Sequence, residues 1–254
     1  MNELAFARIS PRDPIDTERA IDRRVDVWGC ALRADADEIA AWHDELSVEE
    51  RQRATRFVRG HDRDRHVIAH GILRHVLARY RAVAPRELRF VQSPHGKPAL
   101  VSSGSAPRIG FNLSHAGDAA LIAIAENVEV GVDLERERGD IDAAGIAARF
   151  FDEGERAAIA DAADPVRAFF RHWVAKEAVL KAHGSGFALP LDGFAILFES
   201  DDAASVVAPS LPDVQRSRWR IHMLKVPLGW QAAVCVPQGF RVHVRTPALG
   251  ERIE

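Results

Sequence analysis

The 254-residue sequence has little cysteine and no long apolar run. Its two cysteines, Cys30 and Cys235, lie far apart in apolar, strand-like stretches, which favours two buried thiols over a disulfide and fits a reducing compartment. No segment approaches the roughly 18 consecutive apolar residues of a membrane span. Met1–Arg19 also lacks an apolar run of signal-peptide length. We therefore expect a cytoplasmic protein with no membrane partner.

An excess of positive charge is absent as well. Lys and Arg number 34 against 37 Asp and Glu, a formal net charge of −3. Nucleic-acid binding depends on many uncompensated basic side chains, so we expect no nucleic-acid partner. The chain is long enough, and at 47% hydrophobic residues apolar enough, for one large domain or two modest ones.

One order of elements occurs twice along the chain. In the first half, a strand, three helices and three strands are predicted at Val25–Leu32, Asp35–Leu46, Ser47–Arg59, Asp62–Arg81, Leu88–Val91, Ile109–Leu113 and Ala119–Ala125. In the second half, a strand, three helices and four strands are predicted at Val128–Leu134, Ile141–Phe150, Asp152–Ala162, Pro165–Ala182, Phe194–Glu199, Trp219–Val226, Trp230–Val236 and Phe240–Arg245. Ser47 with Glu50 predicts a capping box, and Gly184 predicts a helix end.

This repetition predicts an α+β fold of two similar lobes related by a pseudo-twofold, with the active site between them. We place a polar N-terminal arm at residues 1–23, an N-terminal lobe at 24–127 and a C-terminal lobe at 128–254. Ser102–Pro107 and Asp201–Pro212 are predicted to be loops.

Acidic residues gather in the stretch from Gly131 to Lys181. Along the strand, apolar residues alternate with Asp133 and Glu135, so both carboxylates point to one face. On the later helix, Glu177 and Lys181 are one turn apart on the same stripe. If the helix packs across that face, three carboxylates converge on an all-oxygen site suited to Mg²⁺. Taken alone, the acids also fit a solvated strand face and a surface ion pair.

Two further short motifs in the sequence are candidates for the same site. Ser114 and His115 lie where a strand runs into a tight turn, and Lys97 lies in the stiff Gly96-Lys97-Pro98 loop. Each is also compatible with an ordinary turn.

Together the motifs resemble those of Sfp-type 4′-phosphopantetheinyl transferases, in order and spacing, from about Val25 to about Val236. The matching segments are Gly96-Lys97-Pro98, Phe111-Asn112-x-Ser114-His115, Gly131-x-Asp133-x-Glu135 and Trp173-x-x-Lys176-Glu177-Ala178-x-x-Lys181. The resemblance implies two α+β lobes with coenzyme A and Mg²⁺ between them.

Residue roles follow from the resemblance. It implies that Asp133, Glu135 and Glu177 hold Mg²⁺ against the pyrophosphate of coenzyme A, and that Lys181 reaches the same group. Lys176 either belongs to this site or pairs with an acid. The implied contacts with coenzyme A come from Arg53, Arg65, His66, Lys97, Ser114, His115, Lys176 and Lys181.

The implied reaction transfers 4′-phosphopantetheine from coenzyme A to a serine of an acyl or peptidyl carrier protein, converting apo to holo form. Glu177 is the expected base, acting alone or through a metal-bound water, and Lys181 is the second expected catalytic residue. We expect a monomer. Two alternatives remain at this stage, a Mg²⁺-dependent nucleotide phosphohydrolase and a non-catalytic coenzyme A binding protein.

Overall fold

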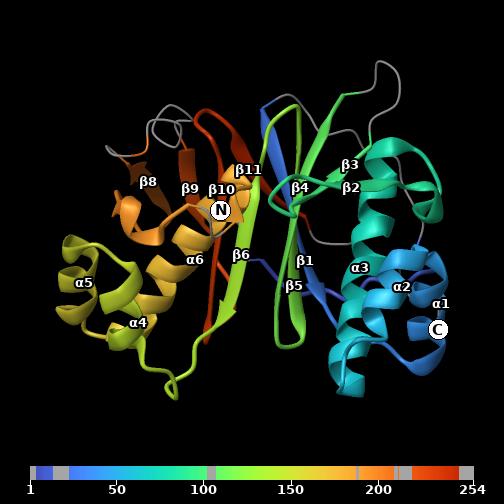
Figure 1. Cartoon of the computed structure of the whole chain (residues 1–254), viewed down its shortest axis with the longest axis horizontal. Helices are drawn as coiled ribbons and strands as arrows, with labels where there is room; N and C mark the ends of the chain where they lie inside the picture. The colour runs from blue at the N-terminus through green and yellow to red at the C-terminus, as the bar shows by residue number, and fades with distance from the viewer. Residues whose placement is uncertain are drawn as a thin grey trace.

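Two lobes, each a sheet covered on its outer side by helices, lie side by side (Figure 1). The computed structural model describes residues 4–13, 23–101, 107–186, 189–208, 211 and 219–245. The predicted α+β class and two-lobe arrangement are confirmed. Part of the predicted Ser102–Pro107 loop lies outside the described residues.

The first lobe contains a long helix, α3, packed on a sheet. In chain order its elements are β1 (Arg24–Ala31), α1 (Ala36–Glu45), α2 (Val48–Ala54), α3 (Gly60–Arg81), the 3₁₀ turn η1 (Pro85–Glu87), β2 (Phe90–Gln92), β3 (Pro98–Leu100), β4 (Ile109–Ala116) and β5 (Ala119–Glu126). β5 pairs antiparallel with both β1 and β4, whereas β2 and β3 form a separate hairpin.

The second lobe repeats this order. Its elements are β6 (Gly131–Arg136), α4 (Ala143–Phe150), α5 (Glu153–Ala160), α6 (Pro165–His183), η3 (Leu191–Gly193), β7 (Ala195–Phe198), β8 (Ala203–Val207), β9 (Trp219–Met223) and β10 (Trp230–Pro237). The sheet order is β6-β10-β9-β8-β7, with every pairing antiparallel. The strand β8 corrects the prediction of a loop over Asp201–Pro212, because Val206 and its neighbours pair with β7.

Both ends of the chain pack differently from the predicted division into an N-terminal arm and two lobes. Strand β11 (Arg241–Arg245) pairs parallel with β1 in the first sheet, so it does not belong to the second lobe. The N-terminal arm is also more than a polar tail. Leu4 is fully buried and its backbone N–H donates to the carbonyl oxygen of Lys225, so apolar burial fixes this segment between the lobes.

Local sequence explains where the helices begin and end. Asp35, Ser47 and Asp152 each accept a hydrogen bond from a backbone N–H three residues on, completing capping boxes, as predicted for Ser47. Helix α6 ends at Gly184, whose φ of 78° lies in the left-handed region that glycine adopts without strain.

Apolar side chains of the described residues form four clusters, of which a small one joins α4, α5 and α6. One core lies between the first sheet and helices α1–α3, a second between the second sheet and α6, and a third between the two sheets. Cys30 and Cys235 are both free and buried, as predicted. Among the described residues, none of the helices combines the length and apolar character that a membrane crossing requires.

Candidate functional site

Helix α6 lies directly on β6 because the strand begins with a residue that has no side chain. A Cβ on Gly131 would lie 2.0 Å from the carbonyl oxygen of Ala178 and 2.3 Å from the nitrogen of Ala182. Glycine is therefore required for this approach of two backbones. The packing brings Lys181 of α6 onto Asp133 of β6, as the predicted faces require.

The carboxylate of Asp133 is at the centre of the site. Its Oδ1 accepts hydrogen bonds from Ser114 Oγ at 2.9 Å and from Lys181 Nζ at 2.6 Å. Lys181 Nζ also lies 2.9 Å from Ser114 Oγ, which closes a three-membered network. The other oxygen, Oδ2, is buried and has no hydrogen-bond partner among the described residues. Because a buried polar atom without a partner is unfavourable, Oδ2 is suited to a ligand.

The carboxylates around Asp133 perturb one another. Burial, followed by the negative charge of Asp133, raises the pKa of Glu177 to about 7, although the ammonium of Lys181 opposes the shift. Burial and Asp133 also raise the pKa of Glu135. A cation placed among the three carboxylates would relieve this repulsion.

These acids suit a hard cation, although they are not gathered as ligands. Within the part of the chain that the structure describes, no three His, Cys, Asp or Glu side chains stand in metal-binding geometry. Lys181 supplies the positive charge beside Asp133 instead. The unpartnered Oδ2 and the raised pKa values of Glu135 and Glu177 nevertheless fit Mg²⁺, which prefers carboxylate oxygen.

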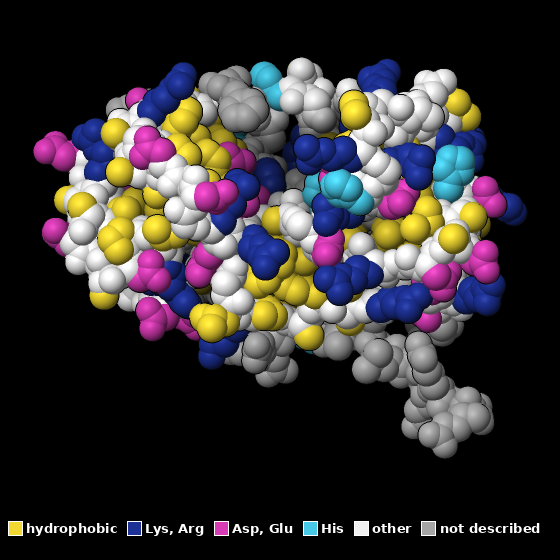
Figure 2. All heavy atoms as spheres, turned by 90° about the horizontal axis from the view of Figure 1, so that it is seen from below, with side chains coloured by type: hydrophobic (Ala, Val, Ile, Leu, Met, Phe, Trp, Pro, Cys, Tyr) yellow, Lys and Arg dark blue, Asp and Glu magenta, His cyan; other side chains and the backbone are white. Residues whose placement is uncertain are grey.

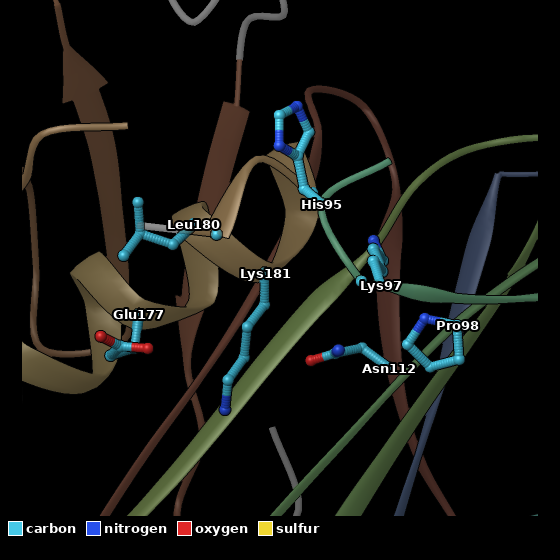
Figure 3. Close-up of a pocket in the computed structure, with 10 residues that line it drawn as sticks. His95, Lys97, Pro98, Asn112, Glu177, Leu180 and Lys181 are labelled. Carbon is cyan, nitrogen blue, oxygen red and sulfur yellow. The ribbon is translucent and has the colours of Figure 1, made fainter. Parts of the chain in front are cut away.

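A cavity of 220 Å³ adjoins this cluster between the lobes (Figure 3). Glu177, Leu180 and Lys181 line it from α6, and Asn112 lines it from β4. The Gly96–Pro98 loop lines the cavity on the side opposite α6 (Figure 3). A second cavity of 610 Å³ in the first lobe is also lined by Gly96 and Pro98, so both cavities adjoin this loop.

Lys97 borders the first cavity, but its ammonium is used within the protein. Nζ lies 2.7 Å from Glu129 Oε2 and 3.1 Å from the carbonyl oxygen of Val130. It also lies 3.4 Å from the carbonyl oxygen of Ala182, at the end of α6. Lys97 therefore joins the two lobes in this structure. Its ammonium already has partners within the protein, and it would have to exchange them to make the predicted contact with coenzyme A.

Lys176 does not belong to the site. Its side chain is fully buried, with Nζ 2.8 Å from Glu155 Oε2 and 2.8 Å from the carbonyl oxygen of Leu191. The predicted contact with coenzyme A is wrong, because Lys176 points from α6 into the core of the second lobe. The alternative expectation, pairing with an acid, is confirmed.

The predicted phosphate-binding residues of the first lobe do not lie together in one site. Arg53 is exposed and lines the 610 Å³ cavity. Arg65 is bound to Asp118 at the turn after β4, with Nε 2.8 Å from Oδ1. His115 is exposed on β4, directly after Ser114. The structure therefore spreads these groups along the face between α2 and the β4–β5 turn.

His66 lies inside the first lobe rather than on its surface. Its ring packs on those of Phe57 and His70, with centroid distances of 5.1 and 4.2 Å. Burial, followed by the charge of His70, lowers the pKa of His66 to about 4. A neutral imidazole can contact phosphate only through its single N–H donor, and the ring lies buried against Phe57 and His70.

One site residue was assigned no role from the sequence. Asn112 is buried on β4, and its Oδ1 accepts a hydrogen bond from the backbone N–H of Val132 at 2.9 Å. The signal was present, since Asn112 lies two residues before Ser114 on the same face of a strand.

Paired lobes, a cavity between them, and carboxylates beside an ammonium group are typical of an enzyme that acts on a phosphate-bearing substrate. Residues 129–235 match the family described as the 4′-phosphopantetheinyl transferase superfamily. Residues 33–127 match the one described as 4′-phosphopantetheinyl transferase, N-terminal.

Characterised relatives agree with these matches. The chain is 38% identical to the 4′-phosphopantetheinyl transferase HetI of Nostoc sp., over 56% of this chain and 61% of the relative. It is 30% identical to Sfp of Bacillus subtilis, over 75% and 81%, and 31% identical to psf-1 of Bacillus pumilus, over 82% and 83%. The chain therefore belongs to the 4′-phosphopantetheinyl transferase family.

Proposed function

We propose that this protein transfers the 4′-phosphopantetheine group of coenzyme A to a serine hydroxyl of an acyl or peptidyl carrier protein. The serine oxygen forms a bond to the phosphorus that bears the pantetheine, and the pyrophosphate P–O bond breaks to release 3′,5′-ADP. The observation that carries the proposal is the Asp133, Lys181 and Ser114 network beside Glu177, in a chain of this family.

Coenzyme A would lie across both cavities. Gly96 and Pro98 line both cavities, which supports one extended ligand with its ends near Arg53 and Lys181. Arg53 suits the 3′-phosphate, because a guanidinium group binds phosphate through two parallel hydrogen bonds. Arg65 is the second proposed contact of this phosphate, and its guanidinium would exchange its bonds to Asp118 for it. Ser114 lies beside Lys181 and His115 follows it on β4, and both are proposed contacts of the nucleotide part of coenzyme A.

Mg²⁺ is the proposed metal, held by Asp133, Glu135 and Glu177. When bound, it would neutralise charge on the pyrophosphate. Lys181 would hold the same pyrophosphate and stabilise the charge that develops on the leaving group. Asp133 and Ser114 hold the Lys181 ammonium through the hydrogen bonds described above.

Glu177 is the proposed general base. In the metal-free protein the pKa of Glu177 is about 7, because burial and the negative charge of Asp133 both raise it. A bound Mg²⁺ would lower this pKa, because a nearby cation favours the charged carboxylate. The serine proton would pass to the Glu177 carboxylate as the serine oxygen attacks phosphorus.

The partner would bind the face of the molecule drawn in Figure 2. That view shows Lys and Arg side chains bordering an apolar area near its middle. Such a mixture fits a protein partner. We propose a monomer acting in the cytoplasm, without nucleic acid or membrane.

Intact-mass analysis of an apo carrier domain tests this function. After incubation with the protein, coenzyme A and Mg²⁺, the domain is expected to gain one phosphopantetheine group. A domain whose acceptor serine is replaced by alanine is the control and should stay unmodified. An unmodified wild-type domain, across several carrier types, would contradict the proposal.

A further inference from the structure

Strands β4 and β6 run side by side at the junction of the lobes, yet each ends its own sheet. The first sheet has the order β11-β1-β5-β4 and the second begins with β6. The two strands are neighbours in space (Figure 1) and are not paired with each other in either sheet. The edge of β6 that faces β4 therefore needs other partners for its buried backbone groups.

Side chains of β4 provide those partners. The backbone N–H of Val132 donates to Asn112 Oδ1 at 2.9 Å, and that of Leu134 donates to Ser114 Oγ at 3.3 Å. Both pairs are separated by 20 residues, so the two strands run in the same direction and in constant register. Asp133 lies between the two bonded residues.

We propose that Asn112 is a positioning residue for the transfer reaction, which acts by fixing β6 so that Asp133 faces the site. The inference rests on the proposed function. Asn112 touches the backbone of Val132, one residue before Asp133, whereas Ser114 touches the Asp133 carboxylate itself. Asn112 thus acts through the strand and Ser114 acts directly.

Burial makes this bond consequential. Val132 is fully buried and Asn112 is 8% exposed, so water cannot readily replace the amide oxygen. Without Asn112 Oδ1, the buried N–H of Val132 would have no partner, which favours a shift of β6 away from β4. Asp133 is the next residue of β6, so its carboxylate would move as well. Small displacements matter in such sites, because a misplacement of about 1 Å can lower a rate about 100-fold.

The test combines hydrogen exchange with kinetics in the Asn112→Ala variant. The Val132 amide is expected to exchange about fivefold faster, since a typical hydrogen bond contributes about 1 kcal/mol. We expect kcat to fall about 100-fold while KM for coenzyme A changes much less. KM is decisive because Asn112 also borders the 220 Å³ cavity.

Two further variants separate positioning from general destabilisation. Asn112→Asp keeps an oxygen acceptor for Val132 and should restore slow exchange of its amide, with part of the turnover. Asn127→Gly is the matched control. It removes a side-chain amide that bonds the backbone N–H of Arg108 at the same junction, and glycine tolerates the φ of 60° found there. Its Val132 exchange and kcat should match those of the wild type.

Several results would overturn the proposal. They are unchanged Val132 exchange in Asn112→Ala, faster exchange with unchanged kcat, or a rise in KM alone, which would make Asn112 a binding residue. If Asn112→Ala does not fold, Asn112→Ser provides the same test. If the wild type shows no transfer, the proposed function fails, whereas the exchange experiment still decides whether Asn112 fixes β6.

Discussion

The two lobes contain corresponding ion pairs that use different cations. In the first lobe, Arg74 of α3 bonds Glu50 of α2 at 2.6 Å and the carbonyl oxygens of Pro85 and Leu88, around η1. In the second, Lys176 of α6 pairs with Glu155 of α5 at 2.8 Å.

The match extends to the carbonyl partners. Lys176 also donates to the carbonyl oxygens of Leu191, the first residue of η3, and Phe194, the residue after η3. Pro85 and Leu88 hold the same two positions at η1. Each glutamate is the third residue of its helix and completes a capping box. Such a correspondence in sequence position and in contacts supports the repetition of one lobe by the other.

The lobes differ at the positions that follow each cation. Glu177 comes after Lys176 and borders the cavity, whereas His75 comes after Arg74 and packs on Trp42. Five positions after each cation, Lys181 bonds Asp133 of β6, whereas Arg79 lies over Trp28 of β1.

This difference shows which part of the repeat serves stability and which serves chemistry. Both lobes keep the ion pair, which joins two helices to a 3₁₀ turn. Among the described residues, the second lobe places Glu177 and Lys181 on the next face of its long helix, opposite Asp133 and Glu135 of β6. The first lobe fills that space with aromatic side chains.

The largest expected effect comes from breaking the ion pair of the second lobe. Glu155→Leu would leave the Lys176 ammonium buried without its anion, and such changes cost about 3–5 kcal/mol of folding free energy. Glu50→Leu should cost less, because the Glu50 side chain is 16% exposed against 2% for Glu155. Denaturant unfolding measures both. An equal or smaller loss in Glu155→Leu would contradict the ranking.

Lys181 should matter for rate more than for binding. Lys181→Ala is expected to lower kcat about 100-fold, because a group that stabilises developing charge contributes about that much. Coenzyme A affinity, measured by calorimetry, should weaken far less. The corresponding change in the first lobe, Arg79→Ala, is the control and should leave kcat near its wild-type value. If affinity falls as steeply as kcat, Lys181 is a binding residue only.

A smaller effect is expected from Arg53. Removing a charge-assisted hydrogen bond costs about 1.5–3 kcal/mol, so Arg53→Ala should raise KM for coenzyme A about tenfold or more. It should also lose the preference for coenzyme A over 3′-dephospho-coenzyme A. Arg56→Ala, also exposed and on the adjoining turn, is the control. An unchanged preference would remove Arg53 from the 3′-phosphate site.

The smallest effect concerns pH and compares one carboxyl group from each lobe. Burial raises the pKa of Glu45 in the first lobe to about 7, and burial with Asp133 does the same for Glu177. A raised pKa means that the folded state holds the proton more tightly. The stabilisation is therefore complete below about pH 4.5, the unfolded value, and is lost as pH rises through about 7.

Thermal unfolding without metal should show this loss between pH 5 and 7.5, and Glu45→Gln or Glu177→Gln should each reduce it. Added Mg²⁺ should diminish the loss in the wild type and in Glu45→Gln, because the ion binds near Glu177. Identical pH profiles for wild type and Glu177→Gln would show that Glu177 is not perturbed by its neighbours.

Local patterns predicted the elements, whereas long-range partners could not be read from them. Alternation on β6 and the four-residue spacing on α6 correctly placed Asp133 and Lys181 together. The pairing of β11 with β1 joins residues at opposite ends of the chain, which no local signal specifies. The burial of Leu4 is likewise set by distant partners. It packs between the two lobes, and the polar sequence around it gives no sign of that position.

The error over Lys176 has a different origin. Lys176 precedes Glu177 by one position, so it lies about 100° around the helix from the Glu177 and Lys181 stripe. Helical geometry alone would have placed it away from the site, and the family resemblance outweighed that geometry. Its partner Glu155 is recognisable in the sequence only as the third residue of a capping box.

The most direct test of the account follows both products in one reaction, with and without an apo carrier domain. If the second-lobe carboxylates and Lys181 serve transfer to a serine, 3′,5′-ADP should appear only with the carrier, in a one-to-one ratio with holo-carrier. Asp133→Asn should abolish both products together. Release of 3′,5′-ADP at the same rate without any carrier would contradict the account, because water would then be the acceptor.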